Sequence, residues 1–282
     1  MIQLRANPVY KRETLTAFRG WRLPGALFGV NGCLALFALL NMYGAITQMR
    51  MAAQIRYTAF MELFLFAAVY EFLLATVYMP AGCAGAVGSE REAKTLQLLL
   101  STRLSAWDIV LGKLCARLSD MGLFLVSGFP IFALSFVYGG IYLTDICVFV
   151  ACMASYALLL GSVALFFSCL LRRAWACVVA SYGAAVALLG GTLGIHILSK
   201  LFFDEAGAYL LLLLNPVATF YIAVGARLGA SPLFGSLLAL PQTGGYVFLT
   251  NHFTAVSLAV QVAVSFAVLG WAAAALGRAG GE

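Results

Sequence analysis

The sequence predicts an all-α polytopic membrane protein with six transmembrane helices, and three observations support this fold class. Of the 282 residues, 63% are hydrophobic and only 10% are charged, whereas a soluble globular protein is nearer a quarter charged. Several apolar runs reach the length of about 20 residues that a helix needs to cross a bilayer. The alternating segments of about 10 residues that a transmembrane β-barrel needs are not found in the sequence. We therefore treat residues 1–282 as a single transmembrane domain.

Short polar or charged segments separate the predicted spans. The second span is longer than a bilayer requires and contains Pro80, so we expect it to tilt, kink or project from the membrane. The six spans are predicted at about residues 25–46, 57–87, 120–142, 146–171, 174–198 and 253–276.

The segment 1–23 is expected to form an amphipathic elbow helix at the membrane surface. Asn7 and Pro8 are the residue types typical of a helix N-cap and of the first helical position. Phe18 and Trp21 follow at helical spacing, while the cations fall on other faces. Aromatic side chains next to the first span favour an interfacial helix over a merely solvated basic tail.

The segment 88–117 is the only long charged stretch between two strongly apolar runs. Ser89 and Glu92 match the S-x-x-E capping box and predict that a new, leucine-rich helix starts there. Ser105 and Asp108 form a second capping box and predict the helix that leads into the third span. We therefore expect a cytosolic loop with a short helix in its first half.

The segment 199–252 is expected to lie outside the cytosol and to contain short broken or re-entrant helices. Residues 208–240 are apolar, but Asn215-Pro216 and Ser231-Pro232 interrupt them. Interrupted helices are tolerated at membrane depth only where protein or a water-filled cavity surrounds them. This pattern favours short helices over a seventh span.

The distribution of cations predicts the orientation. With the N-terminus in the cytosol, the cytosolic segments carry five cations in 1–23, five in 88–117, two in 172–173 and Arg278. The outer segments carry four. This bias follows the positive-inside rule and predicts that both termini are cytosolic. It also explains the net charge of +6 without nucleic acid as a partner.

The residue patterns do not predict a metal site or a nucleotide site in this chain. The seven cysteines fall in or beside apolar runs without a Cys-x-x-Cys pair, so we interpret them as buried hydrophobic residues. His196 and His252 have no acid or cysteine at ligand spacing. Gly88 and Lys94 have the spacing of a phosphate-binding loop, but Ala93 stands where that loop needs glycine, and the flanks are apolar helices.

Glu71 lies near the middle of the second span, where an ionised carboxylate costs at least about 2.5 kcal/mol. Two interpretations remain open from the sequence: a substrate contact or proton carrier that lines a cavity, or a carboxyl hydrogen-bonded to a neighbouring Tyr or Ser. Glu62 lies nearer the outer surface and is expected to be solvated. Arg117 and Asp120, three residues apart, are expected to form an ion pair on the helix surface.

The charged loop resembles the signature of the permeases of type-2 ABC exporters. Residues 90–102 have the pattern acid-base-acid, Thr-Leu, a leucine cluster and a Ser/Thr-rich turn, and Gly112-Lys113 precedes the third span. Asn7-Pro8 resembles the start of that family's elbow helix, and Asn215-Pro216 resembles its broken segment before the last span. Lys94 departs from the family, which usually has glycine before Thr-Leu.

The resemblance implies a permease subunit in the cytoplasmic (inner) membrane that works with a second, identical or different permease. Soluble ABC ATPase subunits would bind on the cytosolic side and hold ATP and magnesium, so the chain itself would have no cofactor and would not be an enzyme. The helix in the loop would be the coupling helix that docks on the ATPase. The residues assigned to this coupling are Ser89, Glu90, Arg91, Glu92, Lys94, Thr95, Leu96, Leu99 and Leu100.

The expected function is export of a peptide, lipid-like or drug-like substrate, with ATP hydrolysed by the separate subunit. Two other functions remain open from the sequence. One is an ATP-independent secondary transporter or channel that uses Glu71. The other is a membrane scaffold that uses ATP-driven motion to act on an outer partner.

Overall fold

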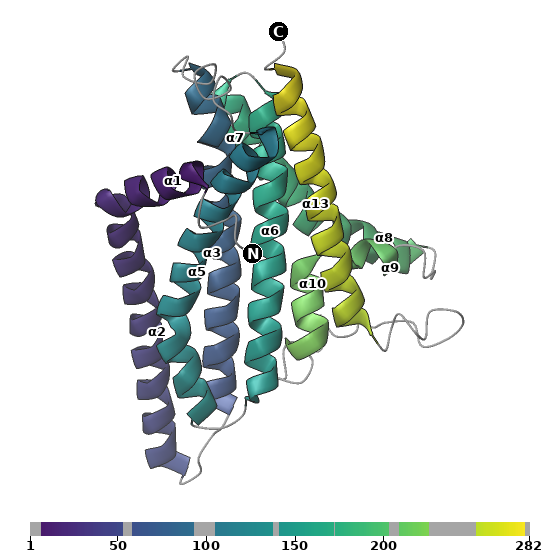
Figure 1. The fold of residues 1–282 in the computed structure, drawn as a ribbon. Helices are drawn as coiled ribbons and strands as arrows, with labels where there is room; N and C mark the ends of the chain where they lie inside the picture. The colour runs from purple at the N-terminus through teal and green to yellow at the C-terminus, as the bar shows by residue number, and fades with distance from the viewer. Residues whose placement is uncertain are drawn as a thin grey trace.

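In a computed structural model the chain forms a bundle of long helices (Figure 1). The structure describes residues 7–52, 58–92, 105–137, 141–171, 173–202, 209–225 and 252–279, and all structural statements below concern these residues. Within them, six helical stretches are long and apolar enough to cross a membrane. The predicted fold class is therefore confirmed.

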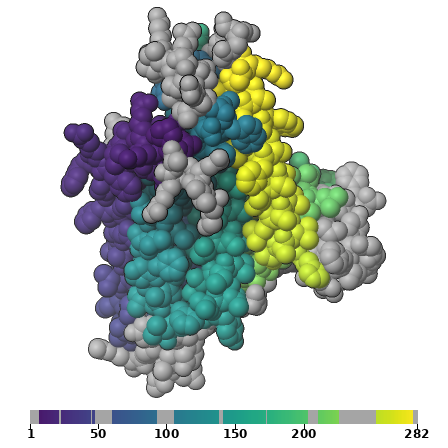
Figure 2. Space-filling view, in the orientation of Figure 1, coloured from purple at the N-terminus to yellow at the C-terminus, as the bar shows by residue number. Residues whose placement is uncertain are grey.

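The first two helices meet at a sharp bend. Helix α1 (Pro8–Arg19) begins as predicted, because the Asn7 side chain accepts a hydrogen bond from the Val9 backbone N–H. Helix α2 (Arg22–Ala52) then runs down one edge of the bundle, with α1 lying across its upper end (Figure 1). In the space-filling view α1 packs directly against the bundle (Figure 2).

Helix α3 (Thr58–Glu92) does not end where the sequence predicted. Ser89 and Glu92 were expected to start a new helix, but α3 continues through both residues, so that prediction is wrong. A capping box would turn the Glu92 carboxylate back to the Ser89 backbone N–H, but this carboxylate accepts instead from the N–H of Ala174 at 2.9 Å. The remainder of the predicted coupling helix, residues 93–104, lies outside the described residues.

Helices α5 (Ala106–Val137), α6 (Leu143–Leu170) and α13 (Phe253–Ala279) complete the centre of the bundle with α3. The capping box predicted at the start of α5 is present: the Ser105 hydroxyl lies 2.6 Å from an Asp108 carboxylate oxygen, and the Asp108 N–H donates back to that hydroxyl. Helix α6 is the most buried of the six spans, because it packs between α3 and α13.

The fifth span is less regular than the others. Helix α7 (Ala174–Val186) passes through a π-helical turn, η2 (Ala187–Gly191), into α8 (Thr192–Phe202). Helix α8 extends away from the bundle towards the short helix α9 (Tyr209–Leu212) (Figure 1).

The broken segment before the last span is confirmed over its described part. Helix α9 is followed by α10 (Pro216–Phe220) and a second π-helical turn, η4 (Tyr221–Gly225). Asn215 separates α9 from α10 and caps the latter, since its carbonyl oxygen accepts from the N–H groups of Val217 and Ala218. Residues 203–208 and 226–251 of the predicted outer loop lie outside the described residues.

Candidate functional site

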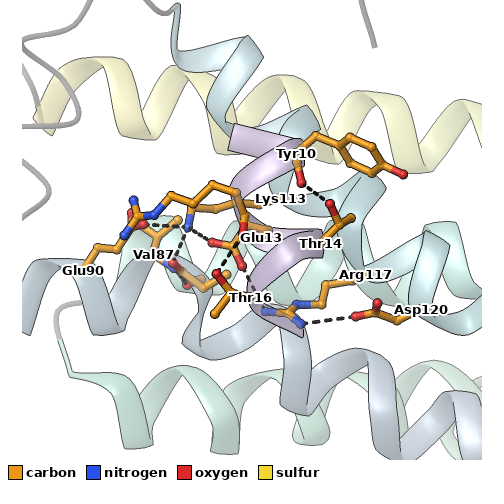
Figure 3. Close-up of polar contacts among 12 residues, drawn as sticks. Tyr10, Glu13, Thr14, Thr16, Val87, Glu90, Lys113, Arg117 and Asp120 are labelled. Atoms are coloured by element: carbon orange, nitrogen blue, oxygen red, sulfur yellow. Dashed lines mark hydrogen bonds and ion pairs between the residues drawn. The ribbon is translucent and has the colours of Figure 1, made fainter. Parts of the chain in front are cut away.

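A cluster of charged side chains joins α1 to both helices that flank the segment 93–104 (Figure 3). Lys113 of α5 is at its centre, and its side chain is only 2% exposed. The ammonium nitrogen donates to Glu13 of α1 at 3.2 Å, to Glu90 of α3 at 3.0 Å and to the Ala86 carbonyl at 2.8 Å. An ammonium has three donors, so each of them has an acceptor here.

Arg117 extends the cluster one turn further along α5. Its guanidinium lies 3.2 Å from the second carboxylate oxygen of Glu13 and 3.3 Å from Asp120. The Tyr78 hydroxyl of α3 donates to the same Asp120 oxygen at 2.9 Å. The predicted pairing of Arg117 with Asp120 is thus confirmed, but its placement on the helix surface is wrong for Asp120, whose side chain is 1% exposed.

Helix α1 is also fixed to the beginning of α5 by uncharged contacts. The Asn7 amide donates to the Asp108 carbonyl at 2.7 Å, and the hydroxyls of Tyr10 and Ser119 lie 3.0 Å apart. Gly112 permits this approach, because a Cβ there would lie 3.0 Å from the Asn7 amide nitrogen. Gly112 and Lys113 therefore act together: the glycine lets α1 approach, and the lysine binds it.

The end of α3 is attached to the connection between α6 and α7. Arg91 donates to the carbonyls of Leu171 and Cys169 at 3.0 and 3.1 Å, which places a cation at the C-terminus of α6. Glu92 accepts a hydrogen bond at 2.9 Å from the N–H of Ala174, which places an acid at the N-terminus of α7. Both charges thus match the helix ends that they contact.

These contacts decide how the predicted coupling residues are placed. Glu90, Arg91 and Glu92 lie together at the end of α3, each bound to a different element, and Ser89 is exposed beside them. The remaining predicted coupling residues fall outside the described residues: Lys94, Thr95, Leu96, Leu99 and Leu100. The two ends of the segment 93–104, on α3 and α5, are therefore bound to each other and to three other helices, α1, α6 and α7. A displacement of either end would act directly on these helices.

A cavity of about 280 Å³ lies next to the charged cluster, between α1, α2, α3 and α5. Glu13, Tyr78 and Arg117 form part of its polar wall, and Leu23 and Ala26 of α2 part of its apolar wall. The ion pair between Glu13 and Arg117 therefore borders open space on one side, whereas Lys113 is enclosed.

Glu71 of α3 is separate from this cluster. It lies deep in the bundle, where α3 faces α2 and α5. Its side chain is fully buried, and neither carboxylate oxygen has a hydrogen-bond partner among the described residues. One oxygen lies 2.9 Å from where a Cβ on Gly128 would be, with Phe132 and Leu34 beside that position. The predicted hydrogen bond to Tyr or Ser is not observed, and a side chain without exposed surface does not line an open cavity. Glu62, by contrast, is exposed as expected.

Sequence reasoning missed a second buried polar group, centred on Gln261 of α13. Its amide nitrogen donates to the Leu213 carbonyl and to the hydroxyls of Thr219 and Ser257, and its oxygen accepts from Ser155 of α6 at 2.9 Å. The group joins the broken segment to α6 and α13. A signal was present in the sequence, because serine and glutamine recur every fourth residue along one face of an otherwise apolar span.

No protein-family model matches the sequence, and no curated protein is significantly similar to it. The described residues thus define a helical membrane protein with six candidate spans. In it, a charged cluster joins the first helix to α3 and α5, the two helices on either side of the segment 93–104.

Proposed function

We propose that the chain is the transmembrane permease subunit of an ATP-driven ABC exporter. It works in the cytoplasmic membrane with both termini in the cytosol, beside a second permease and soluble ATPase subunits. The substrate class is a peptide, lipid-like or drug-like molecule. The proposal rests on the sequence pattern at 90–102 and on the way in which both ends of that segment are attached.

The attachment of the segment 93–104 is the observation that supports the proposal most. Lys113 joins the end of α3 to α5 and, through Glu13, to α1. Arg91 and Glu92 join the same end to α6 and α7. A partner that pushes on this segment from the cytosol therefore moves the ends of several spans together. Such a joint movement is needed if closure of the ATPase subunits is to shift the membrane helices as rigid bodies.

Site-specific photocrosslinking tests the proposed contact. A photoreactive amino acid at Leu99 is expected to capture a soluble ATPase in intact cells. The same amino acid at Tyr142, exposed where α5 connects to α6, serves as the matched control and is expected to capture none. Adducts from Leu99 with lipid alone would contradict the assignment.

A reconstitution experiment tests the coupling itself. The captured ATPase, added to the chain in lipid vesicles, is expected to hydrolyse Mg-ATP faster with the wild-type chain than with Leu99→Asp. The variant should retain the helical content and detergent stability of the wild type, because the change lies outside the apolar spans. Equal hydrolysis with both chains, at equal association, would refute a coupling role for this segment.

A second candidate function, an ATP-independent secondary transporter or channel, is favoured by one observation, the buried carboxyl of Glu71. Transport that persists without any ATPase and changes its pH profile in Glu71→Gln would support it. Transport that needs the ATPase and has the same pH profile in both chains would exclude it.

A further inference from the structure

We propose that Glu71 is a proton-binding site inside the bundle, occupied by a proton whenever α3 and α5 pack as they do in this structure. This property belongs to the chain alone. It does not depend on whether the chain is a permease or on whether an ATPase binds to it.

The geometry of Glu71 is that of a carboxyl with no counter-charge from the part of the chain that the structure describes. The side chain has no exposed surface, and both of its oxygens are buried without a hydrogen-bond partner among the described residues. α5 offers Gly128 and Phe132 at this point, and α2 offers Leu34, all of them uncharged. An ionised carboxylate with neither water nor a partner is the most unfavourable state of this group, so it is held as the neutral acid.

The titratable neighbours of Glu71 do not change this conclusion. The Tyr70 hydroxyl on the same helix interacts with the Cys33 thiol on α2. Neither group carries a positive charge at neutral pH. Among the described residues, no charged side chain acts on the Glu71 carboxyl.

The close fit identifies the occupant as a proton. A metal cation requires several oxygen ligands, and Gly128, Phe132 and Leu34 beside this carboxyl supply no side-chain oxygen. An organic cation or a side chain from a second copy requires a path to the carboxyl, but the chain itself covers Glu71 completely. A proton is the one cation that needs neither ligands nor additional volume.

The position of the site gives proton binding a mechanical consequence. One Glu71 oxygen lies only 2.9 Å from the position of a Cβ on Gly128, so the absence of a side chain there lets α5 approach this carboxyl closely. If the carboxyl ionises, it requires water or a cation, and neither fits until the two helices separate. Release of the proton therefore favours a different packing of α3 against α5.

Infrared spectroscopy of the full chain in lipid measures the protonation directly. At neutral pH the exposed carboxyls are ionised, and we expect the C=O stretching band of one protonated carboxyl per chain to remain, shifted as in apolar surroundings. The band should disappear in Glu71→Gln and should move in Glu71→Asp, which keeps the acid but changes its position. Glu62→Gln, on the exposed face of the same helix, is the matched control and should leave the band unchanged.

Two results would overturn the proposal. One is a wild-type spectrum at neutral pH without a protonated-carboxyl band, which needs no variant and so cannot be confused with misfolding. The other is a band that persists in Glu71→Gln and disappears on substitution of another buried acid, such as Asp120→Asn.

Discussion

Removal of the Lys113 ammonium provides the sharpest test of the charged cluster. In Lys113→Met the alkyl stem is kept, but the Ala86 carbonyl, Glu13 and Glu90 each lose a donor. Breaking a fully buried ion pair in this way costs about 3–5 kcal/mol, because the remaining charge is left without a partner. Glu13 and Glu90 keep 22% and 16% of their side-chain surface exposed, so water recovers part of the loss.

Glu13 also keeps its contact with Arg117 at 3.2 Å. We therefore expect Lys113→Met to lower the free energy of unfolding by about 2–3 kcal/mol, roughly a 30- to 150-fold change in the folding equilibrium. Reversible unfolding of the purified chain in mixed micelles, followed by circular dichroism, measures this difference. The double variant Lys113→Met/Glu90→Gln should lose less than the sum of its two single variants, because the two side chains interact directly.

Lys11→Met is the matched control, since Lys11 is an exposed cation of α1. A change at such a surface site is expected to stay within about 0.5 kcal/mol. If Lys113→Met lowered the free energy of unfolding no more than Lys11→Met, the cluster would not hold α1 against α3 and α5. The inference that movement of the segment 93–104 is passed to these helices would then be wrong.

Three further predictions follow from contacts elsewhere in the bundle. Arg91→Ala removes two charge-assisted hydrogen bonds to the end of α6 and should increase proteolysis within the segment 93–104, whereas Arg173→Ala, an exposed cation nearby, should not. Gln261→Leu removes the hydrogen bonds of the amide to Leu213, Thr219, Ser257 and Ser155, each of which keeps another partner, and should lower the free energy of unfolding by about 1–2 kcal/mol; an unchanged unfolding midpoint would count against the network. Gly161→Ala places a Cβ 2.6 Å from a neighbouring leucine methyl and should lower the free energy of unfolding by about 1 kcal/mol or more. Gly183→Ala has open space around it and should stabilise the chain slightly; the opposite order of unfolding midpoints would contradict the packing.

The number of the spans and the approximate position of most of them could be predicted from the sequence, because lipid demands long apolar helices wherever the chain crosses it. The third was predicted at about residues 120–142, whereas α5 runs over Ala106–Val137. The N-cap at Asn7 was predicted, since Asn followed by Pro is typical of a helix start. The same pair at Asn215-Pro216 was interpreted only as an interruption, although the structure shows that it also begins a helix.

The capping-box pattern gave one correct and one wrong prediction. At Ser105 and Asp108 the chain begins a helix, as the pattern indicates. At Ser89 and Glu92 the same pattern lies inside the last turns of α3, where the Glu92 carboxylate accepts from the N–H of Ala174, 82 residues later in the chain. A local pattern does not contain that tertiary contact.

The charged cluster itself was beyond a single sequence. Lys113 stood out only as part of Gly-Lys before a span, and its partner Glu13 is 100 residues earlier in the chain. Nor did Arg91 and Glu92 indicate that each would meet the end of a different helix. Those pairings depend on how the helices pack, which charge pattern alone does not determine.

The side-chain amide of Asn215 has one more consequence. While its oxygen caps α10, its nitrogen reaches the Leu189 carbonyl in the π-helical turn η2 and the Thr192 hydroxyl just beyond it. A wide turn leaves backbone carbonyls short of regular donors, and here a residue from a later part of the chain supplies one. One side-chain amide thereby connects the broken segment to the fifth span. A movement of either element relative to the other would break these hydrogen bonds.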